Sequence, residues 1–138
     1  MKQRVLFLCT GNSCRSQMAE GWLRHLGGEQ FEVVSAGTHP VGLNPYAVMV
    51  MQEANVDISN HVSERVDPYL EQHFDYVITV CDRAQENCPI LPGASSMQHW
   101  SFDDPAKAKG TYEQQLVVFR KIRDEIAERI RHFMKDVS

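Results

Sequence analysis

The chain has 138 residues, of which 43% are apolar and 23% are charged, a size and composition typical of one domain with a sizeable core. Its formal net charge is -4, and no group of lysines and arginines is dense enough to indicate nucleic acid as a partner. The first apolar run, Val5 to Leu8, is too short for an export signal or a membrane span. We therefore expect a monomer in the cytoplasm, with no membrane partner. In such a reducing compartment, the four cysteines are more often catalytic, metal-binding or buried than bridged.

Short apolar and β-branched runs predict four strands, which alternate with helical segments. The strands are expected at residues 4–9, 31–36, 75–80 and 97–102. This alternation predicts a single α/β domain of three layers, with a four-stranded parallel sheet flanked by helices. In such folds the ligand site lies at the carboxyl ends of the strands, where Cys9 and Cys81 both stand.

Helical spacing of apolar residues predicts the connecting segments. A first helix is expected at 16–26, before two glycines, and a second follows the N-cap residue Asn44 and first-turn Pro45. A short helical piece is expected at 68–73. Apolar residues three or four apart from Tyr112 to Phe133 predict a long amphipathic helix that covers the sheet.

The segment between the first strand and the first helix has the features of an oxyanion-binding loop. Its backbone N–H groups can surround a tetrahedral oxyanion at the positive end of the helix. Arg15 adds a planar fork that holds two oxygens at once. This positive environment favours the thiolate form of Cys9, which makes Cys9 the candidate nucleophile. The residues expected to bind the oxyanion are Thr10, Gly11, Asn12, Ser13, Cys14 and Arg15.

Two further residues of this loop have separate expected roles. Ser16 is expected to donate a hydrogen bond to the sulfur of Cys9, whereas Cys14 is expected to pack without an essential role. A cysteine and an arginine six positions apart could also arise by chance. The strand end, the internal glycine, the serine after the arginine and the following helix together favour a binding site.

The sequence Cys-Thr-Gly-Asn-Ser-Cys-Arg-Ser-Gln-Met-Ala-Glu at 9–20 resembles the signature of low-molecular-weight tyrosine phosphatases and their arsenate-reductase relatives. Within that group it is most similar to the thioredoxin-coupled arsenate reductases. The resemblance implies a low-molecular-weight phosphatase-like fold, arsenate as substrate with phosphate as a competitor, and thioredoxin as reductant. The matching segments beyond the loop are 35–37, 44–45, 57–61, Cys81, 87–92 and 99–105.

Displacement of an oxygen from arsenate or phosphate needs a proton for the leaving group, which a carboxylic acid can supply. The sequence offers Asp103 and Asp104 before Pro105. The resemblance assigns the acid to Asp104 and leaves Asp103 as a hydrogen-bonding residue of the loop. An ordinary Asp-Asp-Pro turn with neither role is the alternative.

Cys81 and Cys88 distinguish reduction from hydrolysis. A phosphatase needs only the nucleophile, the arginine and the acid, whereas arsenic(V) must also accept two electrons, which two thiols can supply by forming a disulfide. The expected relay passes from Cys9 to Cys81 and then to Cys88. The alternatives are two structural cysteines or a zinc site, although the cysteine spacings do not form paired zinc knuckles.

A cation site is also implied by the resemblance, because some relatives hold a potassium ion beside the loop. The corresponding residues are Asn12, Glu20, Ser35 and Glu64, the last of which stands where those relatives have aspartate. Glu20 could equally be an ordinary acid of the helix surface. No tightly bound cofactor is expected.

Two other functions compete with arsenate reduction. A low-molecular-weight protein tyrosine phosphatase would use the same loop, but such enzymes present aromatic side chains after the Asp-Pro pair, where this chain has Ala106-Lys107-Ala108. A non-catalytic phosphate or thiol sensor would not need Asp104 together with the relay cysteines.

Overall fold

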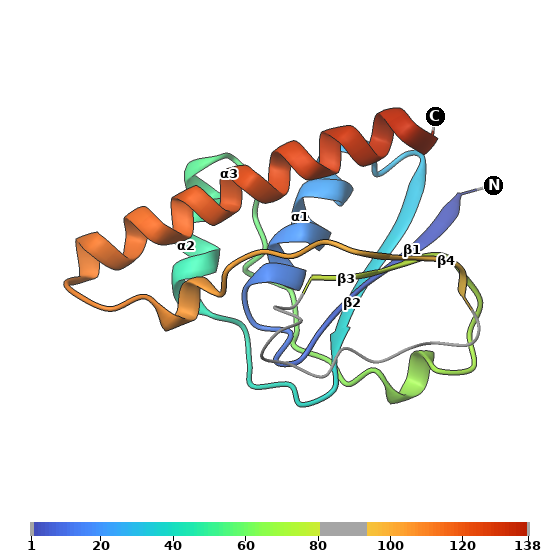
Figure 1. The fold of residues 1–138 in the computed structure, drawn as a ribbon, viewed down its shortest axis with the longest axis horizontal. Helices are drawn as coiled ribbons and strands as arrows, with labels where there is room; N and C mark the ends of the chain where they lie inside the picture. The colour runs from blue at the N-terminus through green and yellow to red at the C-terminus, as the bar shows by residue number, and fades with distance from the viewer. Residues whose placement is uncertain (1, 81–93, 138) are drawn as a thin grey trace.

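A four-stranded parallel sheet forms the centre of the structure (Figure 1). The computed structural model describes residues 2–80 and 94–137. The sheet has the order β2-β1-β3-β4, so β1 lies inside it and is buried on both faces. Its strands are β1 (Gln3–Cys9), β2 (Phe31–Gly37), β3 (Phe74–Thr79) and β4 (Ala94–His99). The predicted α/β fold class with a four-stranded parallel sheet is confirmed; the described α-helices lie on one side of that sheet, and the 3-10 helix at 67–69 lies on the other.

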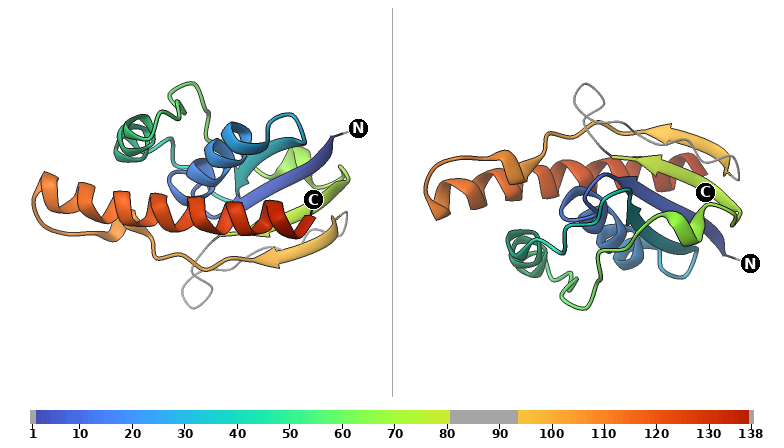
Figure 2. Two further views of the ribbon diagram at one scale, coloured as in Figure 1. Left: turned by 90° about the horizontal axis from the view of Figure 1, so that it is seen from above. Right: turned by 90° about the horizontal axis from the view of Figure 1, so that it is seen from below.

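Among the described residues, α1 and α3 cover one face of the sheet, and α2 packs against α1 and α3. Seen from above and from below, α3 lies in front of the sheet in one view and behind it in the other (Figure 2). The opposite face carries Leu6, Leu8 and Val77, which pack with Val66 and Tyr69 in and beside a 3-10 helix. The helices are α1 (Arg15–Gly27), α2 (Pro45–Glu53), α3 (Tyr112–Val137) and the 3-10 helices η1 (Asp67–Tyr69) and η2 (Pro105–Lys107).

The fourth strand lies earlier in the chain than predicted. Residues 94–99 pair with β3, although the prediction placed the strand at 97–102. The apolar residues that suggested the later position, Trp100 and Phe102, are buried but follow the strand, and Trp100 packs its ring 5.6 Å from that of Phe133 in α3. The strand itself is polar because it lies at an edge of the sheet. The helical piece expected at 68–73 is likewise the shorter η1.

Gly37 marks the place where β2 approaches the loop that follows β1. It is paired with Cys9 across the sheet, and it also bonds the segment at 64–66, donating to Glu64 O (2.8 Å) and accepting from Val66 N (2.9 Å). A Cβ atom at this position would lie 2.5 Å from the carbonyl oxygen of Thr10. The absence of a side chain therefore lets β1, β2 and the 60–66 segment meet at the site.

Within the described ranges, no helix combines the length and the apolar content needed to cross a membrane.

Candidate active site

The loop after β1 turns its carbonyl groups outward, toward two neighbouring segments. The carbonyls of Cys9, Thr10, Gly11 and Ser13 accept hydrogen bonds of 2.9–3.3 Å from backbone N–H groups in residues 38–44. The Asn12 carbonyl accepts a bond of 2.9 Å from the Ser63 hydroxyl. A trans peptide directs its C=O and the following N–H to opposite sides. The N–H groups of residues 10–14 therefore point inward, toward the site.

The N-terminus of α1 opens into the same space. Cys14 is its N-cap residue, and no side chain of the described residues caps the helix. The first N–H groups of a helix lack partners within it and carry partial positive charge. The loop and the helix end thus form the oxyanion-binding arrangement that the sequence predicts.

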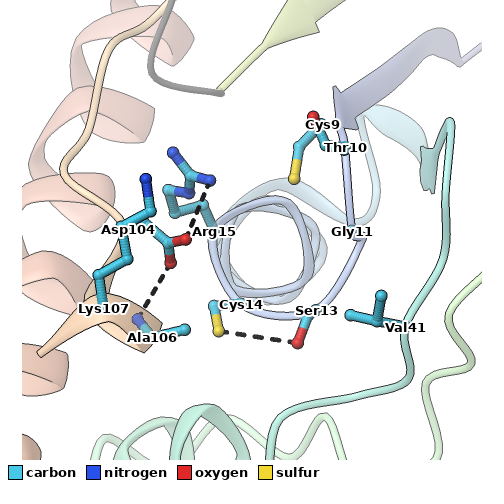
Figure 3. A pocket seen from close by; sticks show the side chains of 10 residues that line it. All are labelled: Cys9, Thr10, Gly11, Ser13, Cys14, Arg15, Val41, Asp104, Ala106 and Lys107. Carbon is cyan, nitrogen blue, oxygen red and sulfur yellow. Dashed lines mark hydrogen bonds and ion pairs between the residues drawn. The ribbon is translucent and has the colours of Figure 1, made fainter. Parts of the chain in front are cut away.

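A pocket of ≈ 280 Å³ lies over this loop, and Figure 3 shows it with the residues around the end of α1. It brings together the predicted nucleophile, arginine and acid from β1, from α1 and from the turn that precedes η2. The lining residues are Cys9, Thr10, Gly11, Ser13, Cys14, Arg15, Val41, Asp104, Ala106 and Lys107.

Arg15 and Asp104 are fixed relative to each other and to the backbone around them. Arg15 is buried; its Nη1 donates to Phe102 O (3.2 Å), and its Nη2 lies 3.7 Å from Oδ2 of Asp104. The other carboxylate oxygen of Asp104 accepts a hydrogen bond from Ala106 N (3.0 Å). Asp103 is exposed and does not line the pocket. The geometry therefore favours Asp104 over Asp103 as the acid.

The two thiols of the pocket differ in their surroundings. Cys9 ends β1 and is 3% exposed. Burial raises the pKa of the Cys14 thiol to about 12, against a partial lowering by the hydrogen bond with Ser13. Cys14 is therefore a neutral thiol at physiological pH, which suits a packing residue and not a nucleophile.

Beneath the loop lies a set of buried polar side chains that bond to one another. Asn12 has a φ of 46°, and its Nδ2 donates to the hydroxyls of Ser16 (2.8 Å) and Ser35 (3.0 Å). Its Oδ1 accepts from Glu64 N (2.8 Å). Ser35 in turn donates to Glu20 Oε1 (2.5 Å). We call the five buried members of this set the loop floor: Asn12, Ser16, Gln17, Glu20 and Ser35.

The side chain of Ser16 has one described hydrogen-bond partner, its neighbour Asn12 in the loop floor. Its hydroxyl accepts from Asn12, and the hydrogen bonds between described residues include none from Ser16 to the sulfur of Cys9. Because an accepting hydroxyl keeps its own proton, the bond to Cys9 stays a prediction.

Neither Gln17 nor His61 was predicted from the sequence to take part in the site. Gln17 Nε2 donates to the carbonyls of Asn12 (3.2 Å) and Val62 (3.1 Å), so its Oε1 faces His61 Nδ1 at 3.0 Å. An acceptor at that distance requires the proton of His61 on Nδ1. The second nitrogen, Nε2, lies 3.9 Å from Glu20 Oε2. In the sequence, this contact was indicated only by the resemblance of residues 57–61 to the same segment of the family.

The four residues implied for potassium do not surround one space. Glu20, Ser35 and Glu64 line a second cavity of ≈ 190 Å³, but Asn12 is not among its lining residues. Arg24 Nε lies 3.0 Å from Glu20 Oε2, and the Tyr69 hydroxyl donates to Glu64. In the described part of the chain, no group of three His, Cys, Asp or Glu residues could hold a metal ion. In this arrangement Arg24 and Tyr69 already pair with the two carboxylates, and the potassium site stays a prediction.

Cys81 and Cys88, the remaining predicted site residues, lie outside the described residues.

Comparison with known proteins agrees with this geometry. The sequence pattern of the low molecular weight phosphotyrosine protein phosphatase family matches residues 4–138. The chain belongs to that family, as its loop sequence indicated. It is 51% identical over 132 residues to an arsenate reductase of Bacillus licheniformis, covering 96% of this chain and 95% of that protein. It is 47% identical over 129 residues to an arsenate reductase of Bacillus subtilis, covering 94% and 93%.

Two solved structures extend the comparison. An arsenate reductase in the phosphate binding state has a TM-score of 0.83 and 31% identity, with 99% of both chains covered. A thioredoxin-dependent arsenate reductase of Corynebacterium glutamicum has a TM-score of 0.76 and 29% identity, covering 99% of this chain and 62% of that one.

Proposed function

We propose that this protein reduces arsenate to arsenite through a relay of Cys9, Cys81 and Cys88 that a thioredoxin resets. One observation carries the proposal: Cys9, Arg15 and Asp104 line a single pocket, over a loop whose N–H groups face inward. The relatives that are about half identical over nearly their whole length are arsenate reductases.

The first step uses the three residues of the pocket. The sulfur of Cys9 attacks arsenic while Arg15 and the loop N–H groups hold the other oxygens. Asp104 gives a proton to the departing hydroxide, which leaves as water. Cys9 is then bonded to arsenic(V).

The later steps transfer two electrons to arsenic. The thiolate of Cys81 attacks the sulfur of Cys9, the sulfur–arsenic bond breaks with its electron pair on arsenic, and arsenite leaves. Cys88 then attacks Cys81, which frees Cys9 and leaves a disulfide between Cys81 and Cys88. A dithiol of the thioredoxin class reduces that disulfide and returns the enzyme to its starting state.

The proposal includes no resident cation and no second copy of the chain. Arg24 supplies the positive charge beside Glu20, and we take a monomer as the active unit. Phosphate, which has the same tetrahedral shape, is expected to compete with arsenate.

The test is arsenate-dependent oxidation of NADPH by thioredoxin, thioredoxin reductase and this protein. We expect steady flux with the intact chain and none with Cys9→Ser. A parallel mixture of glutaredoxin, glutathione and glutathione reductase identifies the reductant. No arsenate-dependent flux with either active reductant mixture contradicts the proposal.

The relay has its own test in single turnover with Cys81→Ser and Cys88→Ser, and with Cys14→Ser as the matched cysteine control. Cys81→Ser should release no arsenite. Cys88→Ser should release about one equivalent and stop with Cys9 bonded to Cys81. Sustained turnover by Cys88→Ser excludes the three-cysteine order.

A low-molecular-weight phosphatase activity is the second candidate, supported by family membership. The pocket wall is formed by Val41, Ala106 and Lys107, which offer no aromatic ring to stack on a tyrosyl group. We expect slow hydrolysis of aryl phosphates at most. Hydrolysis of a phosphotyrosyl peptide at a higher kcat/KM than arsenate reduction would reverse the assignment.

A further inference from the structure

Lys107 is the one lining residue of the active-site pocket whose charge has no place in the chemistry proposed above. Among the described residues that line the pocket, the charged side chains are Arg15, Lys107 and Asp104. We propose that Lys107 binds the substrate and favours a free inorganic oxyanion over a phosphate ester. This inference rests on the proposed function and adds a specificity residue to the same site.

Backbone contacts fix the position of the Lys107 main chain relative to Asp104. It is the last residue of η2, and its N–H donates to the carbonyl of Asp104 (3.1 Å). Pro105, between them, is buried. The lysine is therefore held at a constant position relative to the acid, although its own side chain is exposed.

The side chain extends into the pocket. Figure 3 shows it running from the turn past Asp104, toward the side of the pocket where the Arg15 guanidinium lies. All three side chains line the same pocket of ≈ 280 Å³. The flexible stem of a lysine lets its ammonium group follow a ligand oxygen within such a space.

The charge balance of the pocket calls for a second cation. A phosphate-like oxyanion carries about 1.5 to 2 negative charges at pH 7. The guanidinium of Arg15 lies 3.7 Å from the Asp104 carboxylate, so part of its charge is already balanced. The neutral Cys14 thiol adds no charge. Lys107, on the turn that carries Asp104, brings a second cationic side chain to the pocket.

That position distinguishes free oxyanions from esters. The loop N–H groups hold the oxygens nearest Cys9, so the remaining oxygen faces Asp104 and the open side of the pocket. In arsenate or phosphate this oxygen is free and can bind the Lys107 ammonium. In an aryl phosphate the same oxygen carries the organic group, which displaces the lysine.

The binding test uses inorganic phosphate and the protection of Cys9 from iodoacetamide. We expect Lys107→Met to raise the phosphate concentration that gives half protection about tenfold, as for one charge at about 6 Å in a partly screened site. Lys107→Arg should restore most of the protection. Lys109→Met is the control, because Lys109 is exposed and does not line the pocket. Equal protection of the Lys107→Met and Lys109→Met proteins overturns the proposal.

Kinetics test the specificity. For Lys107→Met, KM for arsenate should rise about tenfold with kcat little changed, whereas KM for an aryl phosphate should change less than about twofold. The dependence of kcat/KM on ionic strength should also weaken, since one attracting charge is gone. An equal rise of both KM values rejects the ester discrimination, and a fall in kcat alone shows that Lys107 acts through Asp104. If phosphate protection changes as expected but no arsenate is reduced, the inference stands and the proposed function fails.

Discussion

The polar residues below the oxyanion loop and those above it are organised in opposite ways. The loop floor is buried, and each of its side chains bonds to another part of the floor or to backbone. Above the loop, the pocket rim, which we define as Val41, Asp104, Ala106 and Lys107, is partly or fully exposed and is held by a short turn. Buried, satisfied networks are rigid, whereas exposed turns accept change at little cost in stability. The floor should therefore fix the shape of the loop, and the rim should determine which substrate binds there and how fast it reacts.

The largest expected effect belongs to the rim. Asp104→Asn should slow formation of the Cys9–arsenic bond about a hundredfold to a thousandfold, because the proton donor is lost. The stability should change by less than about 0.5 kcal/mol, since the asparagine oxygen can still accept the Ala106 N–H. Rapid-quench single turnover and denaturant unfolding measure the two quantities. Asp103→Asn is the control, and a slower first step in that variant than in Asp104→Asn would show that the acid is misassigned.

The next effect belongs to the floor and should appear as lost stability. Asn12→Ala should cost about 3 kcal/mol of unfolding free energy, because two hydroxyls and a backbone N–H lose their partner and a left-handed conformation stays occupied. Asn55→Ala is the matched control: its φ is 64°, so it carries the backbone cost of about 1 kcal/mol without the network. Equal losses in urea unfolding would mean that the floor contributes nothing beyond backbone conformation.

A smaller effect concerns the cation. Replacing potassium chloride by choline chloride at constant ionic strength should change the activity less than about twofold, since Arg24 already neutralises Glu20. Arg24→Gln should make stability and activity rise with added potassium. Arg65→Gln is the control because it removes an exposed ion pair with Asp67. The stability and activity of this variant should not rise with added potassium. A potassium requirement in the unaltered protein would show that a cation, and not Arg24, serves the floor.

The smallest effect is expected at Cys14. With a pKa of about 12, its thiol is protonated at pH 8, and its thiolate fraction grows only as the pH approaches 12. Iodoacetamide at pH 8 should therefore leave Cys14 unmodified in peptide mapping by mass spectrometry, and Cys14→Ser should keep most of the activity. Loss of activity in a folded Cys14→Ser protein would make this thiol part of the chemistry.

The sequence predicted the parts of the site that lie close together in the chain or carry distinctive chemistry. The loop from Cys9 to Arg15 follows from a strand, a glycine and a helix start, and Asp104 from its proline and the family resemblance. Lys107 and Val41 could not be assigned, because only the fold brings their segments over the loop. Gln17 looked like an ordinary polar residue of a helix, since nothing local reveals that 60–66 covers it.

For the fold, too, the sequence predicted the elements that a local pattern marks and misplaced the one that depends on tertiary packing. The buried strands β1, β2 and β3 were found within one or two residues, because continuous apolar runs mark them. The edge strand β4 was placed three residues too late, because the buried Trp100 and Phe102 outside the sheet produced a stronger apolar pattern than the small residues Ala-Ser-Ser at 94–96 inside it.

The close approach at Gly37 has a genetic consequence. Every amino-acid substitution of this glycine adds at least a Cβ atom, which would lie 2.5 Å from the Thr10 carbonyl and 3.0 Å from Asn12 N. Neither neighbour is the flexible end of a side chain, so the loop itself must shift. In a random-mutagenesis screen for loss of activity, we expect inactive alleles at codon 37 as often as at the codons of residues that touch the oxyanion. Selection for activity should therefore retain glycine at position 37, although this residue takes no part in the reaction.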